Sequence, residues 1–137
     1  MLSDEQAGAA GEAPAEAQAR KFQRELSAGL TALVLLSVLA EAETDLYGYE
    51  IAKRLNTEEV ATPFKQGALY PVLRNMSAAG LLSSRVVPSY AGPPRRYYRV
   101  TPLGREVLGA WRETWLGTRA FVDTVVTPHH PAQETQP

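Results

Sequence analysis

The segment from Val60 to Arg105 contains no aspartate or glutamate, although it carries seven basic residues. The net charge of the whole chain is only −1, so this basic segment is a local asymmetry. It holds two recognisable pieces, a helical pattern over 67–82 and an arginine-rich hairpin pattern over 92–101. An acid-free helix and hairpin suit a polyanion, of which double-stranded DNA is the obvious example.

The hydrophobic periodicity predicts the order of the other elements. Residues 1–20 and 128–137 offer few large apolar side chains, and we expect both to be disordered tails. Three helices followed by a hairpin is the order of a winged helix-turn-helix. The predicted fold is mainly α with a small β-hairpin: a winged helix-turn-helix domain over 21–101, then a C-terminal dimerisation helix over 102–127. The predicted helices cover 21–42, 46–56, 66–79 and 102–126, and the strands 82–88 and 95–101.

Three local signals mark element ends. Pro71 removes one amide donor from the third helix, so we expect a bent or irregular first turn there. Gly80 is predicted to end that helix in a left-handed conformation. Thr101 followed by Pro102 is typical of an N-cap and the first residue of a helix.

The second and third helices would form the helix-turn-helix pair, and the hairpin would be the wing. Polar side chains there can reach base edges and phosphates. Two alternatives remain: a merely solvated surface with a solubilising hairpin edge, or a winged helix that binds protein. Of the neighbours Tyr97 and Tyr98, one should enter the core and the other face outward. The predicted DNA-binding residues are Tyr47, Lys65, Gln66, Tyr70, Arg74, Asn75, Arg95 and Arg96.

Three sequence blocks carry a family resemblance: LYGYEIAKRL at 46–55, GALYPVLRNMSAAGLL at 67–82 and PPRRYYRVTPLGREVL at 93–108. In this order they resemble the signature blocks of PadR-type transcriptional regulators, over about residues 22–126. The resemblance implies a cytoplasmic, dimeric winged-helix repressor, often of phenolic-acid or drug-efflux genes. The single C-terminal helix is similar to the shorter PadR subfamily. Asn75 and Met76 depart from the commoner basic residue and leucine.

The C-terminal helix carries apolar or small residues at alternating spacings of three and four, which is a heptad pattern. Either this seam packs on its own domain, or it joins two subunits. We expect the second, with the seam formed by Leu108, Trp111, Trp115, Thr118, Val122 and Val125.

A small planar aromatic effector is a further expectation, because the resemblance includes a tryptophan offered to a ligand between subunits. Arg119 would favour an acidic group on such a ligand. The alternative is that the tryptophans simply fill the dimer core. The predicted ligand-binding residues are Leu26, Gly29, Ala32, Leu33, Trp115 and Arg119.

Several classes of function have little support in the sequence. The chain has no cysteine, and its two histidines, His129 and His130, are adjacent in the C-terminal tail, so we expect no metal, no cofactor and no enzymatic activity. The apolar stretch at 30–40 is shorter than the roughly 20 residues that span a bilayer. We therefore expect a cytoplasmic protein without a membrane segment.

Overall fold

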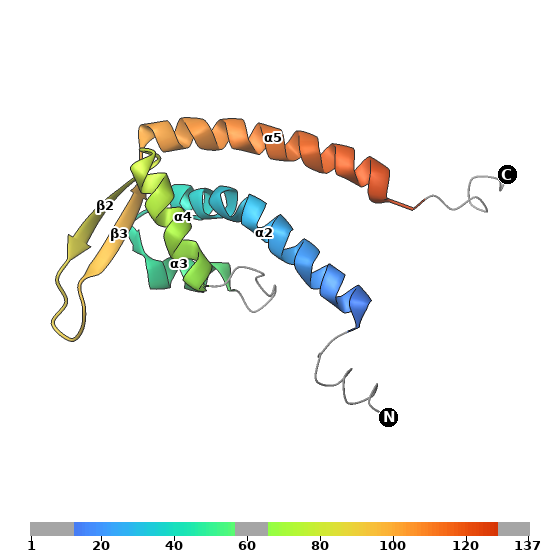
Figure 1. The fold of residues 1–137 in the computed structure, drawn as a ribbon. Helices are drawn as coiled ribbons and strands as arrows, with labels where there is room; N and C mark the ends of the chain where they lie inside the picture. Colours follow the sequence, from blue (N-terminus) through green and yellow to red (C-terminus); the bar gives the residue numbers. More distant parts are fainter. Residues whose placement is uncertain (1–12, 57–65, 129–137) are drawn as a thin grey trace, which may run out of the picture.

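A computed structural model describes residues 13–56 and 66–128 of the chain. Figure 1 shows helices packed beside a small antiparallel sheet, which confirms the predicted mainly helical fold with a hairpin. The predicted tails lie largely outside the described residues, as does the predicted loop at 57–65. In chain order the elements are α2 (Pro14–Glu41), β1 (Leu46–Tyr47), α3 (Gly48–Leu55), α4 (Gln66–Ala78), β2 (Leu82–Val87), β3 (Arg95–Val100) and α5 (Pro102–Val126).

Helix α2 begins seven residues before the predicted start at Lys21, so the expectation of a disordered tail was wrong for residues 14–20. Pro14 is the first helical residue, and Glu16 lies in the first turn, where a carboxylate is favourable. The residues that follow are rich in alanine and other strong helix formers. Because extending an existing helix needs no new nucleation step, residues 14–20 become helical without burying a large side chain.

The second predicted helix starts two residues later than expected. Leu46 and Tyr47 form strand β1, which pairs with Tyr98 and Tyr97 of β3. The Tyr47 amide donates to Glu50 Oε1 at 3.0 Å, which caps the start of α3. The hairpin is therefore part of a three-stranded sheet in the order β1-β3-β2, and β1 joins the wing directly to α3.

The core lies where α2 packs against α3, α4, α5 and β3. Leu35, Leu36, Ile51 and Leu73 are fully buried there. By length and composition alone, α2 is also apolar enough to cross a bilayer, with 22% of the relevant window buried. Core helices of soluble proteins pass the same test, and α2 supplies the centre of this core.

Helix α4 continues through Pro71 to Ala78 and ends as predicted. Gly80 has a φ of 84°, and the Leu81 amide donates to Met76 O at 2.9 Å while the Gly80 amide donates to Ser77 O at 3.1 Å. This pair of bonds is a Schellman motif, for which glycine is the favoured residue. It reverses the chain directly into β2.

A joint formed by Gly80, Leu81, Thr101 and Gly104 links α4, the sheet and α5. The Thr101 amide donates to Leu81 O at 3.1 Å, and its hydroxyl lies 2.6 Å from Gly80 O and 3.1 Å from Leu81 O. The hydroxyl also accepts from the Gly104 amide at 3.0 Å, confirming Thr101 as the N-cap of α5. From this joint α5 runs away from the wing beside α2 and then diverges from it (Figure 1).

Candidate nucleic-acid interface

Helix α4 buries one face and exposes another. Leu69, Leu73 and Met76 lie in the core, whereas Arg74 and Asn75 are exposed. The helix is held close to α3, because a methyl group added at Gly48 would lie 2.8 Å from the Tyr70 hydroxyl and would also overlap its ring. Glycine at position 48 allows this approach without any shift of the Tyr70 side chain. The packing therefore fixes the exposed face of α4 relative to α3 and β1.

The strands of the wing direct neighbouring side chains to opposite faces. Tyr98 and Val100 are buried, and Tyr97 is half-buried on the other face, so the prediction that the two tyrosines separate is confirmed. Arg95 and Arg96 are separated in the same way. Arg96 Nη1 donates to Ser84 Oγ at 3.1 Å across the strand pair. The two arginines therefore approach a ligand from different sides of β3.

On the outer face of the sheet, aromatic rings alternate with guanidinium groups. The Arg95 guanidinium lies 4.6 Å from the centre of the Tyr47 ring, and Arg85 lies 5.0 Å from the centre of the Tyr97 ring. The two tyrosine rings meet edge to face, with centroids 5.3 Å apart. Such cation–π and aromatic contacts stabilise the side chains in one arrangement. They hold Arg95 at the edge of the wing next to α3.

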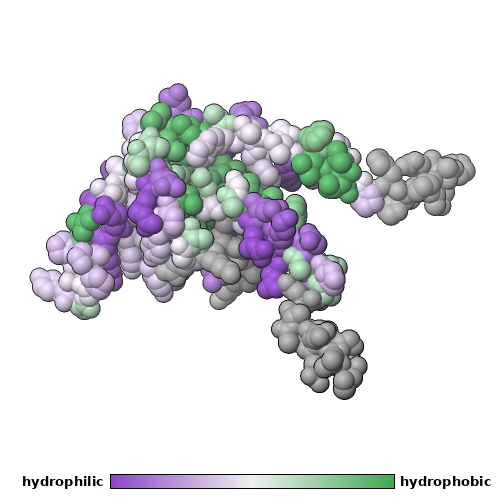
Figure 2. Space-filling model, in the orientation of Figure 1, coloured by the Kyte–Doolittle hydropathy of each residue, from purple (hydrophilic) through white to green (hydrophobic). Residues whose placement is uncertain are grey.

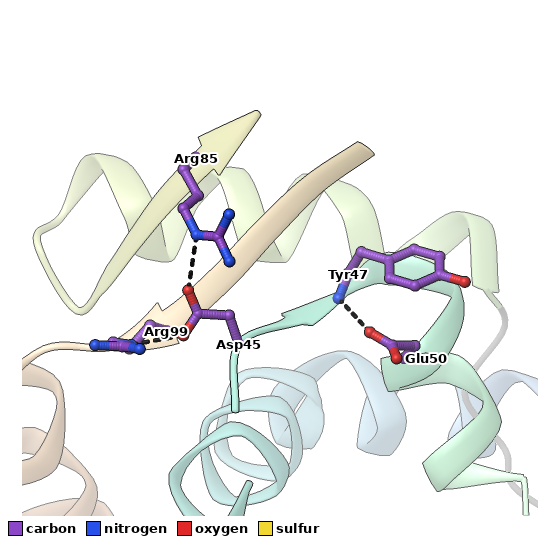
Figure 3. Close-up of polar contacts among 5 residues, drawn as sticks. All are labelled: Asp45, Tyr47, Glu50, Arg85 and Arg99. Atoms are coloured by element: carbon purple, nitrogen blue, oxygen red, sulfur yellow. Dashed lines mark hydrogen bonds and ion pairs between the residues drawn. The ribbon is translucent and has the colours of Figure 1, made fainter. Parts of the chain in front are cut away.

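Asp45, which the sequence analysis did not single out, ties both long strands of the wing to the segment after α2 (Figure 3). Its Oδ2 accepts from Arg85 Nε at 3.1 Å, and its Oδ1 accepts from Arg99 Nε at 2.6 Å. The Asp45 side chain is 11% exposed. The hydrogen bond from Arg99 is the main cause that lowers the pKa of Asp45; burial opposes it, and Arg85 adds to the lowering.

Replacing Asp45 with Asn is expected to lower the free energy of unfolding by about 1 kcal/mol at neutral pH. This is less than is usual for hydrogen bonds to charged groups, because both arginines are largely exposed. The folded-state pKa lies below the ordinary 3.8, so this stabilisation exists above 3.8 and is lost as the pH falls below it. Denaturant unfolding at several pH values measures the difference. Asp123→Asn, in an exposed pair with Arg119, is the matched control and should have little effect. A pH-independent difference would contradict the assignment.

A groove of about 410 Å³ lies between α4 and the wing. It brings together five of the eight residues predicted to bind DNA. Asn75 is exposed on α4 but does not line it, Lys65 lies outside the described residues, and the Gln66 side chain is not described. Tyr49 and Tyr98 also line the groove, although neither was predicted to do so. The five predicted residues are Tyr47, Tyr70, Arg74, Arg95 and Arg96.

A second groove of about 410 Å³ lies between α2 and α5. Arg119 does not line it and instead lies 3.8 Å from Asp123, so the expectation that it faces a ligand here is not supported. Glu25 does line it, together with Trp111, Thr114 and Thr118. Figure 2 shows α2 and α5 separating on this side of the molecule. The predicted ligand-binding residues that line the groove are Leu26, Gly29, Ala32, Leu33 and Trp115.

The predicted heptad seam on α5 begins in the core and ends in solvent. Leu108 is 3% exposed and packs inside its own subunit. It is therefore not available to a partner subunit, although the prediction placed it in the dimer seam. Trp111 packs against the same core and is half-buried. Val122 and Val125 are 41% and 66% exposed, and Figure 2 shows an apolar patch on the distal part of α5.

The comparison with protein families decides the identity of the chain. A profile of the PadR-like family of transcriptional regulators matches residues 35–110, from the buried part of α2 to the first turns of α5. The chain belongs to the PadR-like family. Transcription regulation and DNA binding follow at the level of this family, whose members are regulators and not enzymes. For this PadR-like regulator, the resemblance seen in the three sequence blocks is confirmed.

Solved structures show the same fold. A PadR family transcriptional regulator from Eggerthella lenta is 27% identical, with 83% of this chain and 96% of that one covered, at a TM-score of 0.69. A transcriptional regulator from Clostridium thermocellum is 30% identical, with 75% and 96% covered, at a TM-score of 0.63. Bacillus subtilis PadR in complex with operator DNA is 20% identical, with 73% and 48% covered, at a TM-score of 0.52. At that identity the last match shows the fold alone.

Proposed function

We propose that this protein is a homodimeric repressor that binds a palindromic operator in the cytoplasm, with α4 in the major groove and the wing against the phosphate backbone. One observation carries this proposal. The groove between α4 and the wing is lined by Arg74, Arg95 and Arg96, and no carboxylate lies among its lining residues. Such a surface suits a polyanion. Bacillus subtilis PadR, of the same fold, has been solved in complex with operator DNA.

Selection of duplexes from a random pool tests the proposal as a whole. The protein should enrich one sequence made of two inverted half-sites, because a two-fold dimer presents two identical reading helices. Enrichment of a single, unrepeated half-site would contradict the dimeric mode of binding. The absence of any salt-dependent binding to duplex DNA would favour the alternative, a winged helix that binds protein.

Replacing both Arg95 and Arg96 by Ala should weaken binding to all duplexes alike. The slope of log K against log salt should fall by about two units, because each lost phosphate contact removes roughly 0.9 and the wing offers two contacts. Fluorescence anisotropy over a salt series measures the slope. Arg112 and Arg119, which are exposed on α5, provide a control pair of replacements with the same loss of charge. An equal loss in both double variants would mean that only net charge matters.

The groove between α2 and α5 supports a second, regulatory part of the proposal. A planar aromatic ligand there would contact Trp115 and the small side chains of α2. Glu25 lines the groove and lies 3.9 Å from Lys21, whereas Arg119 does not line it. A neutral ligand, or a cationic one that takes the place of Lys21, therefore suits the groove better than the acidic ligand expected from the sequence. Such a ligand would release DNA only if it bound the DNA-free dimer more tightly than the DNA-bound one.

Titration with planar dyes and phenolics should quench tryptophan fluorescence in the wild type, with cationic dyes binding most tightly. Trp115→Phe should respond less than the wild type, because it removes one of the two tryptophans that line the groove and leaves Trp111 as the remaining reporter. Glu25→Gln should remove the preference for cations. The effector proposal fails if no compound quenches the wild type, or if Trp115→Phe responds equally; Trp115 would then only fill the dimer core.

A further inference from the structure

Tyr98 is a tyrosine whose ring is buried in the core and whose hydroxyl opens into the groove beside α4. It is 4% exposed, lies on the face of β3 toward α4, and lines the groove between them. None of the hydrogen bonds found within residues 13–56 and 66–128 involves its hydroxyl. Among the described residues, the fully buried side-chain oxygen without a partner is that of Ser77, so the Tyr98 hydroxyl reaches the open space of the groove, where a ligand can accept from it. Burial raises the pKa of Tyr98, and Arg96 and Arg74 oppose the rise, so near neutral pH the hydroxyl keeps its proton and can donate it.

Two arginines from different elements line the same groove and act on Tyr98. Arg74 comes from α4 and Arg96 from β3. Neither has a carboxylate partner within the described parts of the chain. One nitrogen of Arg96 is held by Ser84, which leaves its other donors for a ligand. Two positive charges that line one groove repel each other unless an anion lies between them.

We propose that this groove is a seat for one phosphate group, held by the guanidinium groups of Arg74 and Arg96 and by the hydroxyl of Tyr98. This inference rests on the proposed function. In the DNA complex the occupant is one phosphodiester of the backbone, contacted at once from the reading helix and from the wing. Arg74 is then a phosphate contact and not the reader of a base edge. Because they share one phosphate, α4 and the wing contact the same strand of the DNA.

A backbone scan tests whether the two arginines share a phosphate. Each phosphate of the selected operator is replaced in turn by a neutral methylphosphonate, and the affinity is measured for the wild type, Arg74→Ala and Arg96→Ala. One position should weaken the wild type, and its effect should shrink in both variants. The double variant should lower the salt slope by about 0.9 instead of 1.8, since one phosphate contact is lost. Arginines that map to two different phosphates would overturn the proposal.

Tyr98→Phe tests the hydroxyl, because it removes one oxygen and leaves the ring in the core. Duplex affinity should fall on the order of ten-fold with an unchanged salt slope, as expected for one hydrogen bond to a charged group. Tyr97→Phe removes the same oxygen on the opposite face of β3 and should leave the affinity unchanged. If the wild type and Tyr98→Phe bind DNA with equal affinity, and the melting temperature shows an intact fold, the proposed phosphate site is wrong.

Replacing chloride with inorganic phosphate at constant ionic strength tests whether the site binds free phosphate as well as the phosphodiester of DNA. Displacement of DNA from the wild type but not from Tyr98→Phe would mean that the seat also takes free phosphate. Equal binding in both salts would mean that it takes the phosphodiester of DNA alone. The failure of the proposed function is distinguishable, because the wild type itself would then not bind duplex DNA.

Discussion

Replacing Val122 with Asp is expected to produce monomers and to weaken operator binding at least 100-fold. Val122 is 41% exposed on the distal part of α5, next to the exposed Phe121, Val125 and Val126. A single chain leaves these apolar side chains in water, and such a patch is typical of an interface. A carboxylate buried there without a partner would cost several kcal/mol. A monomer binds one half-site and loses the gain of about 10² to 10⁴ that a linked second site provides.

Sedimentation and operator binding, measured on the same samples, test this prediction. Ala120→Asp is the matched control, because it adds the same charge at an exposed position outside the heptad seam. It should remain dimeric. Trp111 is a poorer target, since it also packs against the core of its own subunit and its loss would confuse unfolding with dissociation. A Val122→Asp protein that stays dimeric and binds its operator normally would remove the distal part of α5 from the interface.

Gly104→Ala is expected to destabilise the fold by about 3 kcal/mol, which corresponds to a fall in melting temperature of roughly 10 °C. A methyl group at this position would overlap the carbonyl oxygen of Leu81 and would lie 2.9 Å from Val100 Cγ1. That carbonyl accepts from Thr101 and has little freedom to move. The strain is therefore placed where α4, the sheet and α5 meet.

Gly109→Ala is the control for this change, since it makes the same substitution in the same helix. Nothing lies within 4 Å of a methyl group added at Gly109, and alanine is the better helix former, so stability should rise by roughly 0.5–1 kcal/mol. Thermal melts of the two variants should thus shift in opposite directions. A melting temperature of Gly104→Ala equal to that of the wild type would show that the joint can open to accept a side chain.

Local patterns predicted most of the fold. The Gly80 cap, the Thr101 cap and both wing strands follow from signals within a few residues, and each matches the structure closely. Strand β1 escaped notice because two residues are too few for a period, and only pairing with the distant Tyr97 and Tyr98 makes them a strand. The helical start at Pro14 was missed because the helix propensity of these residues determines it, and not the burial of apolar side chains.

The side-chain contacts of the site were harder to predict. The bonds from Asp45 to Arg85 and Arg99 cross 40 and 54 residues of sequence, and no spacing rule connects them. The heptad pattern identified one stripe on α5 but gave no means of telling that Leu108 belongs to its own core. Arg119 was placed beside a ligand from its distance to Trp115, whereas the neighbour it meets is Asp123, one turn further on.

The joint at Thr101 has a consequence for the layout of the operator. In the proposed dimer, α5 leads to the two-fold axis, and the direction in which it leaves the joint sets how far apart and in what rotational phase the two α4 helices stand. DNA repeats about every 10 base pairs, so a change in that direction would shift the preferred separation of the half-sites. Within the described parts of the chain, the hydroxyl of Thr101 bonds backbone atoms alone. It thereby helps to determine how many base pairs separate the two halves of the sequence that the protein reads.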